Sequence, residues 1–272
     1  MRIFASEMAI LHIFNPEHDI ALASNLSNFT APHAGRQLRA DLGFLPALWA
    51  DEGDVVLVEN VEYAVKTWER LRKRLVPWGG TLCSIERNAI FHGVEHFVPW
   101  GGTNSISVWG WDKAVRRELE RAGAPLSLLP SDSQLERIRT LSHRQTAAQL
   151  LSLLRINGTV GEAVLCESLE AVERQLGLHS RLVLKAPWSS SGRGIRFIDG
   201  ELNDYHRGWL RNMLSKQGGV MAEPYYEKVK DFGICYSPRP YYEINLPSLA
   251  TSEQKFQIVA DLIHFDLTNG AL

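Results

Sequence analysis

The chain has 272 residues, of which 45% are hydrophobic and 22% are charged, and its formal net charge is −2 at pH 7. This composition supports a sizeable core and excludes wholesale disorder, and the length suits one large domain or two ordinary ones. The near-neutral charge gives no support for a nucleic-acid-binding protein, and the lack of a long apolar run excludes a membrane span.

The cysteines and the first residues bear on the cellular compartment. The three cysteines are widely spaced and form no CxxC pair, so they predict neither a disulfide framework nor a zinc site. The first residues lack the apolar segment of a secretory signal peptide, because Ser6 and Glu7 interrupt it. We therefore expect a cytoplasmic protein with reduced thiols and no membrane partner.

The first half of the chain alternates between short apolar runs and amphipathic segments. Runs rich in Ile, Leu and Val predict buried strands, and apolar residues at helical spacing predict helices. One helix is capped by Asp112 and ends at Gly123, and we expect a short strand after it. Alternating strands and helices predict an α/β fold with a parallel sheet, so we expect a Rossmann-like domain over residues 1–130. The predicted strands here are 8–15 and 54–59, and the predicted helices are 31–43, 62–75 and 112–123.

The second half predicts an α+β arrangement. Two helical segments over residues 131–157 join the halves, and a later helix has Ser168 as its N-cap. The strand that ends at Lys185 is followed by a short loop and a returning strand, which predicts a hairpin, and Gly218 ends the last helix. The predicted strands are 162–168, 181–185, 195–198 and 220–223, and the later helices are 168–178 and 202–217.

Polar residues follow the first predicted strand directly, in the sequence FNPEHD at 14–19. Loops at the carboxyl ends of parallel strands are where ligands bind, so this set could contact a substrate. The alternative is a turn that leads into a helix, whose N-terminus favours acidic side chains. The residues concerned are Asn15, Glu17, His18 and Asp19.

The loop after Lys185 carries the strongest functional signal, in the sequence KAPWSSSGRGI. Its small residues would let backbone N–H groups approach phosphate oxygens, while the Ser hydroxyls, Lys185 and Arg193 add donors and positive charge. It is not a P-loop, because the lysine precedes the loop, and it is not a dinucleotide fingerprint, because no helix follows the glycines. Taken alone, the pattern predicts either a polyphosphate cradle or an ordinary surface loop.

The order of elements around this loop resembles the ATP-grasp superfamily of carboxylate–amine ligases. The motifs that carry the resemblance are the strand ending in Lys185, the loop SSSGRG at 189–194 and the strand VMAEPYY at 220–226. The resemblance covers about residues 140–234, and it implies an ATP-grasp-like α+β domain over residues 131–272 behind a Rossmann-like one. It also implies ATP and Mg²⁺ as ligands, with an unidentified carboxylate and an amine as substrates.

The resemblance also implies roles for individual residues. Lys185 and Arg193 would stabilise charge on the transferring phosphoryl group, and the loop would close over the phosphates. Arg144, where a lysine is more usual, would reach the phosphates, the strand around Glu223 would contact adenine, and Asp231 would contact ribose. The implied nucleotide-binding residues are Arg144, Lys185, Ser189, Ser190, Ser191, Gly192, Arg193, Gly194, Met221, Glu223, Tyr225 and Asp231.

The metal site departs from the superfamily pattern. A Glu-x-Asn motif there holds magnesium, whose charge offsets that of the phosphates, and Glu243 and Asn245 match it. Glu243 lies only 12 residues after Asp231, where the superfamily uses several further elements. Three interpretations stay open: a compact domain with a rebuilt metal site, a chain truncated or altered near residue 235, or a chance match. We therefore expect a divergent or incomplete domain after about residue 235.

Two functions from different classes follow. An ATP-dependent ligase would phosphorylate a carboxylate and let an amine attack the acyl phosphate, whereas a degenerate protein would bind ATP without catalysis and act through a partner. The magnesium site distinguishes them, because a ligase cannot lose it. A third possibility, a sugar-nucleotide enzyme, would be favoured if the loop at 185–194 faced away from the strand at 221–225.

Overall fold

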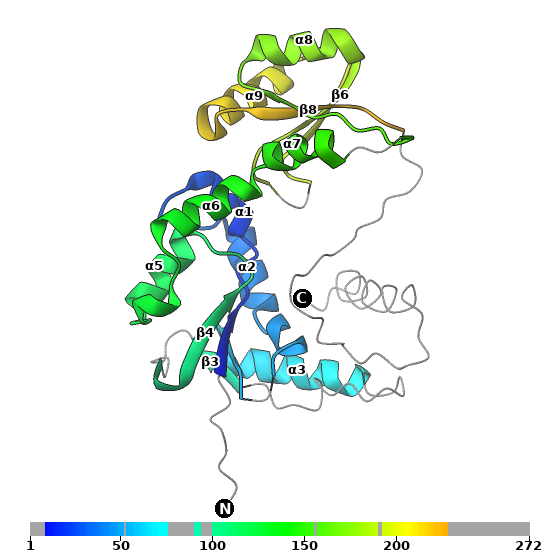
Figure 1. Ribbon diagram of the computed structural model, residues 1–272. Coiled ribbons are helices and arrows are strands. Elements are labelled where there is room, and N and C mark those ends of the chain that lie inside the picture. The colour runs from blue at the N-terminus through cyan, green and yellow to red at the C-terminus, as the bar shows by residue number, and fades with distance from the viewer. Residues whose placement is uncertain are drawn as a thin grey trace, which may run out of the picture.

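The protein has two lobes, each built on one sheet, with two helices between them (Figure 1). The computed structural model describes residues 9–51, 53–75, 90–93, 100–154, 157–189 and 192–227. Within this part of the chain, no helix is both long and apolar enough to cross a membrane.

The N-terminal lobe contains a parallel sheet of four strands in the order β3-β2-β1-β4. This confirms the predicted parallel α/β arrangement. The apolar central strands were predicted, but two outer strands were not, because one is short and the other has the largely polar sequence TNSISV. The strands are β1 (Ala9–Ile13), β2 (Val55–Val58), β3 (Ile90–Gly93) and β4 (Thr103–Val108).

Helices cover both faces of the parallel sheet, as expected for parallel strands. On one face, Leu11 and Leu57 pack in a buried cluster with Leu119, whereas Val56 and Trp68 belong to a cluster on the other face. Alternate residues of β2 therefore enter different cores. The helices are α1 (His18–Ser24), α2 (His33–Leu42), the 3₁₀ helix η1 (Leu45–Leu48), α3 (Val61–Leu75), the 3₁₀ helix η3 (Trp100–Gly102) and α5 (Lys113–Arg121).

The predicted N-cap of α5 is confirmed. The Asp112 carboxylate accepts hydrogen bonds from the backbone N–H groups of Ala114 and Val115, at 2.8 and 2.9 Å. The short strand expected after Gly123 is wrong, because this segment forms the 3₁₀ helix η4 (Leu126–Leu128). The backbone N–H of Leu128 donates to the carbonyl of Pro125 at 2.9 Å, which closes a tight turn instead of leaving an extended chain.

Two helices, α6 (Asp132–Ser142) and α7 (Arg144–Leu154), connect the lobes (Figure 1). Arg139 of α6 donates from Nε to the carbonyl of Leu22 in the N-terminal lobe at 2.9 Å. The carbonyl of Arg139 in turn accepts from Trp188 Nε1 in the C-terminal lobe at 3.0 Å. One residue of the connecting helices therefore contacts both lobes. The domain boundary between residues 130 and 131 stays a prediction.

The C-terminal lobe contains an antiparallel sheet in the order β5-β8-β6-β7. Two helices pack on one face of it, where Leu182, Leu184 and Leu210 are fully buried (Figure 1). This arrangement confirms the predicted α+β character, the hairpin and the Ser168 N-cap. The elements are β5 (Val164–Cys166), α8 (Leu169–His179), β6 (Arg181–Lys185), β7 (Ile195–Asp199), α9 (Asp204–Gln217) and β8 (Val220–Pro224).

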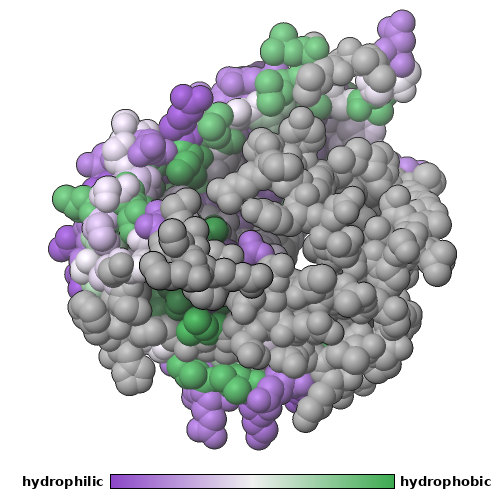
Figure 2. All heavy atoms as spheres, turned by 60° about the horizontal axis from the view of Figure 1, so that its bottom comes forward, coloured by the Kyte–Doolittle hydropathy of each residue, from purple (hydrophilic) through white to green (hydrophobic). Residues whose placement is uncertain are grey.

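On the face drawn in Figure 2, the described residues form no single hydrophobic or hydrophilic region. Figure 2 shows hydrophilic and hydrophobic residues interspersed on the face that it presents. Such a mixture is ordinary for a water-exposed surface.

Candidate functional site

The loop after Lys185 has a narrow, closed base. Lys185 and Ile195 form the last register pair of β6 and β7. The backbone N–H of Ala186 then donates to the carbonyl of Gly194 at 2.7 Å, which extends the pairing one step beyond the strands. The residues after Ala186 are therefore presented at the open end of the hairpin.

Two glycines are required by the shape of this loop. Gly192 has a φ of +69°, a conformation that residues with a Cβ rarely adopt. Gly194 has no room for a side chain, since a Cβ there would overlap the Ser189 side chain and lie 2.9 Å from the Cβ of Ala186. The predicted glycines thus let the two sides of the loop lie in close contact.

Arg144 holds the base of the loop from α7. Its guanidinium donates to the carbonyl of Ala186 at 3.0 Å and to the carbonyl of Ser189 at 2.8 Å. Its backbone N–H donates to the carbonyl of Pro187 at 3.2 Å. These bonds give Arg144 a positioning role toward the loop, and its contact with phosphate stays a prediction.

Trp188 anchors the loop at the junction of the lobes, a role that the sequence analysis did not identify. Its backbone N–H donates to Gln217 Oε1 at 3.1 Å, and the Arg139 guanidinium lies 3.9 Å from its ring centre. The His143 ring contacts it edge-on at 4.4 Å. Burial lowers the pKa of His143, and the Arg139 charge lowers it further, so the neutral ring is favoured. The sequence contained one indication of this role, namely a single tryptophan inside a loop of small residues.

Lys185 and Glu223 lie together on one face of the antiparallel sheet. Lys185 Nζ is 2.5 Å from Glu223 Oε2, and each side chain keeps about a quarter of its surface exposed. The pairing of β6 with β8, in which Lys185 is opposite Met221, brings these residues together although 38 positions separate them. An ammonium has three donors, so Lys185 can bind further acceptors besides Glu223. The loop's lysine is therefore adjacent to the strand predicted to contact adenine.

The same face of the sheet carries exposed aromatic side chains. Phe197 is 63% exposed, and its ring centre lies 6.0 Å from that of Tyr225. The Arg181 guanidinium covers the Tyr225 ring at 4.0 Å. Arg181 and Lys185 are four positions apart along β6, and this even spacing places both side chains on one face of the sheet. The sequence analysis did not identify Phe197 and Arg181 as part of this face. The register of β6 with β7 places both side chains there.

A cavity of about 200 Å³ lies between the loop and the N-terminal lobe. From the loop, Ser189, Arg193 and Gly194 line it, and from the other lobe Glu17 and Gly35 do. The loop therefore faces the N-terminal lobe at the junction. The remaining lining residues are Pro16, Ile20, Ala23, Ala34, Leu38, Ala186, Trp188, Trp209, Met213 and Gln217.

The predicted site residues fall into two groups. The structure brings Arg144, Lys185, Ser189 and Glu223 to the loop and the adjacent strands, together with Gly192, Arg193, Gly194, Met221 and Tyr225. Ser190, Ser191, Asp231, Glu243 and Asn245 lie outside the described residues. Within the described ranges, no group of three or more His, Cys, Asp or Glu side chains is arranged to hold a metal ion.

The polar residues after β1 connect that strand to the end of β4. Asn15 Nδ2 donates to the carbonyl of Gly110 at 2.7 Å, and His18 Nδ1 lies 3.3 Å from Asp112 Oδ2. The helix expected after this turn is present as α1, with Asp19 in its first turn. The turn-and-helix alternative is thus confirmed, while substrate contact stays a prediction.

Comparison with known proteins finds similarity in structure only. No family model and no curated protein matches the chain. It is similar to N5-carboxyaminoimidazole synthetase from Staphylococcus aureus complexed with ADP, at 12% identity and a TM-score of 0.36 over 80% of this chain. It is also similar to the D-cycloserine synthetase DcsG, at 14% identity and a TM-score of 0.39 over 64% of this chain. A third similar structure is D-alanyl-alanine synthetase A from Vibrio cholerae, at 12% identity and a TM-score of 0.36 over 95% of this chain.

The chain spans only part of the length of each of the three structures. The chain spans about half (47%) of the length of the first structure, 59% of the second and 80% of the third. At these identities and TM-scores, no property of the three proteins is carried over to this chain.

Proposed function

We propose that this protein binds ATP and acts as an ATP-dependent carboxylate–amine ligase. The observation that carries the proposal is the convergence of Lys185, the Gly192–Gly194 loop and Glu223 through the pairing of β6 with β7 and β8. A lysine beside a loop that requires glycine suits polyphosphate, because charge and unhindered backbone donors lie together. The exposed aromatic rings on the same face suit a planar base.

The proposed nucleotide site assigns each part of ATP to a part of this surface. The adenine ring would lie along β8 and stack on the exposed Phe197 ring of the neighbouring β7, since the Tyr225 ring is already covered by Arg181. The phosphates would extend toward Lys185 and the loop, with Arg193 supplying a second permanent cation. The ribose would contact Asp231.

The proposed reaction has two steps. A substrate carboxylate oxygen attacks the γ-phosphorus of ATP, the bond from that phosphorus to the β–γ bridging oxygen breaks, and ADP leaves. An amine nitrogen then attacks the acyl carbon, inorganic phosphate leaves with the carboxylate oxygen, and the nitrogen loses a proton. Lys185 and Arg193 would stabilise the charge that develops on the transferring group. Magnesium, which Glu243 and Asn245 would hold, supplies further charge compensation when bound.

Thermal unfolding with and without nucleotide tests the proposal. We would compare the wild type, Lys185→Met, and the control Lys216→Met, whose lysine lies in the last turn of α9. A ligand at about 100 times its Kd stabilises the folded state by about 2.7 kcal/mol, or roughly 5–10 °C of Tm for a chain of this size. We expect that shift with ATP and Mg²⁺ in the wild type and the control but not in Lys185→Met.

The other outcomes separate the two functions that the sequence analysis left open. A shift that is indifferent to EDTA would favour a non-catalytic nucleotide-binding protein. The absence of a shift with any nucleotide would contradict the proposed ATP site. Release of phosphate that requires both an acid and an amine, together with formation of the amide product, would establish the ligase reaction itself.

A further inference from the structure

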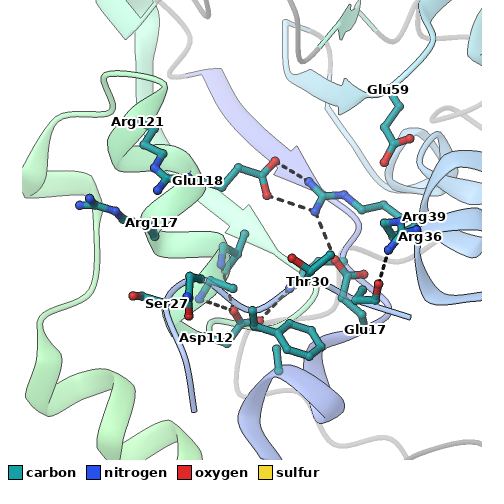
Figure 3. Close-up of a pocket in the computed structure, with 17 residues that line it drawn as sticks. Glu17, Ser27, Thr30, Arg36, Arg39, Glu59, Asp112, Arg117, Glu118 and Arg121 are labelled. Carbon is teal, nitrogen blue, oxygen red and sulfur yellow. Dashed lines mark hydrogen bonds and ion pairs between the residues drawn. The ribbon is translucent and has the colours of Figure 1, made fainter. Parts of the chain in front are cut away.

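A larger cavity, of about 420 Å³, lies at the carboxyl end of the parallel sheet (Figure 3). Small-molecule sites commonly have volumes of about 300–1,000 Å³, so its size suits a small ligand. Residues after three different strands line it: Asn15 after β1, Glu59 after β2 and Asp112 after β4. None of the residues that line this cavity belongs to the loop after Lys185.

The order of the strands singles out this position. From β1 the chain proceeds to β2 and β3 on one side, and β4 then pairs with the other side of β1. The connection from β1 to β2 therefore runs to one side of β1, and the connection from β3 to β4 crosses to its other side. This reversal opens a crevice outside the carboxyl ends of β1 and β4. Ligands of open parallel sheets bind at this kind of reversal.

The opening of the cavity carries exposed positive charge. Arg36 lies on α2, whereas Arg117 and Arg121 lie on α5 at the opposite wall (Figure 3). Arg36 donates to the carbonyl of Ala31 at 2.6 Å, which leaves further guanidinium donors. Arg117 makes a 3.3 Å ion pair with Glu120, and this arginine is half exposed. We call Arg36, Arg117 and Arg121 the arginine rim.

A fourth arginine has a structural role beneath the rim. Arg39 forms ion pairs with Glu118, at 2.7 Å, and with Glu17, at 3.2 Å. These two bonds connect α2 to α5 and to the turn before α1. Because two carboxylates already compensate Arg39, the arginines left for a ligand are those of the rim, and the exposed carboxylate of Glu59 also lines the cavity.

The floor of the cavity offers polar groups. Asn15 and Asp112 are buried there, and Glu17 Oε2 is buried without a hydrogen-bond partner among the described residues. Burial raises the pKa of Glu17, although the Arg39 charge opposes the shift. Buried polar atoms nearly always have a hydrogen-bond partner, so this oxygen is suited to a polar group of a ligand.

We propose that this cavity binds a small organic acid, with its carboxylate or phosphate group at the arginine rim and a hydroxyl or amino group at the floor. Arginine binds both kinds of anion through paired N–H donors, so the rim recognises the shared anionic chemistry. The Glu17 side chain provides the polar contact at the inner end, since the Asn15 amide is already bonded to Gly110 and Asp112.

The cavity also lies next to the loop site. Glu17 lines both this cavity and the one that Ser189, Arg193 and Gly194 line, so a single side chain forms part of the wall of each. If the proposed ligase function holds, the acid in this cavity is its carboxylate or amine substrate. The binding of the acid itself does not depend on that function.

Binding of four defined probes tests the inference: inorganic phosphate, glycerol 3-phosphate, malate and aspartate. They share an anionic group and differ in whether they also carry a hydroxyl or an amino group. Titration calorimetry would compare the wild type with Arg117→Gln/Arg121→Gln and with the control Arg211→Gln, whose exposed arginine on α9 lines neither cavity. Substitutions at exposed positions leave folding nearly unchanged.

We expect at least one probe to bind the wild type and the control, and to bind the double variant about tenfold or more weakly, because charge-assisted hydrogen bonds are lost. The strongest probe distinguishes phosphate esters from hydroxy acids and amino acids. Binding by none of the four, or binding that survives the double substitution, overturns the inference. The ATP-dependent shift in Tm, measured on the same variants, reports on the proposed function separately and should be unchanged.

Discussion

Replacing Gly194 by alanine tests whether the shape of the loop depends on the absence of a side chain. The new methyl group would overlap the Cβ of Ser189 and lie 2.9 Å from the Cβ of Ala186. Rotation of the serine hydroxyl cannot relieve contact with its Cβ, so the backbone has to move. That movement is opposed by the 2.7 Å bond between Ala186 and Gly194 and by the 2.8 Å bond from Arg144 to the carbonyl of Ser189.

The magnitude follows from the cost of overpacking. Inserting a methyl group into a filled space destabilises a protein by about 1–3 kcal/mol, which corresponds to about 2–12 °C of Tm at this chain length. Urea unfolding followed by circular dichroism measures the change in free energy of unfolding. We also expect Gly194→Ala to weaken the ATP-dependent shift, because the displaced loop no longer presents its backbone donors in the same positions.

The matched control is Gly208→Ala. Gly208 is within α9, and a Cβ there meets no atom within 4 Å. Since alanine is favoured over glycine inside a helix by about 1 kcal/mol, this variant should be more stable than the wild type. Equal stability of the Gly194 and Gly208 variants would refute the steric argument for the loop.

Two further predictions concern the N-terminal lobe. Asp112→Ala removes an N-cap that accepts hydrogen bonds from two backbone N–H groups, so urea unfolding should show a free energy of unfolding lower by about 1–2 kcal/mol. Asp112→Asn keeps an oxygen that can accept these bonds and should retain most of the wild-type stability. Equal losses in the two variants would contradict the capping role. Burial raises the pKa of Glu17 above its ordinary value of 4.5, so the folded state holds the proton more tightly than the unfolded state. The protonated Glu17 therefore contributes stability that is fully present below pH 4.5, and this contribution is lost as the pH rises through the pKa of the folded state. Between pH 4 and 7, urea unfolding should show a smaller loss of the free energy of unfolding in Glu17→Gln than in the wild type. Parallel pH profiles of the two proteins would disprove the raised pKa of Glu17.

The local features of both sheets could be predicted from the sequence, because they depend on neighbouring residues. Apolar runs determined β1, β2 and β6, and single capping residues determined where helices begin and end, as Asp112 and Ser168 do. Lys185 was identified at the end of a strand, and the glycine-rich return after it predicted the hairpin that the structure has.

Other features depend on pairing between distant segments, and only the tertiary structure decided them. The largely polar sequence of β4 contains only two apolar residues, Ile106 and Val108, and its pairing with β1 places both against the core. The guanidinium of Arg144 donates to loop carbonyls more than 40 positions away, a positioning contact that the sequence did not indicate, while its contact with phosphate stays a prediction.

The same distinction applies to the two candidate sites. The residue types at the loop site are evident in the sequence, but the contact of Lys185 with Glu223 follows from the register of β6 against β8. The arginine rim consists of residues from α2 and α5 that look like ordinary solvated helix positions in the sequence. They share a cavity because the strand order reverses at β1, and that reversal is a property of the folded sheet alone. The sequence by itself thus determined the local elements and their chemistry, whereas long-range strand pairing determined which side chains meet.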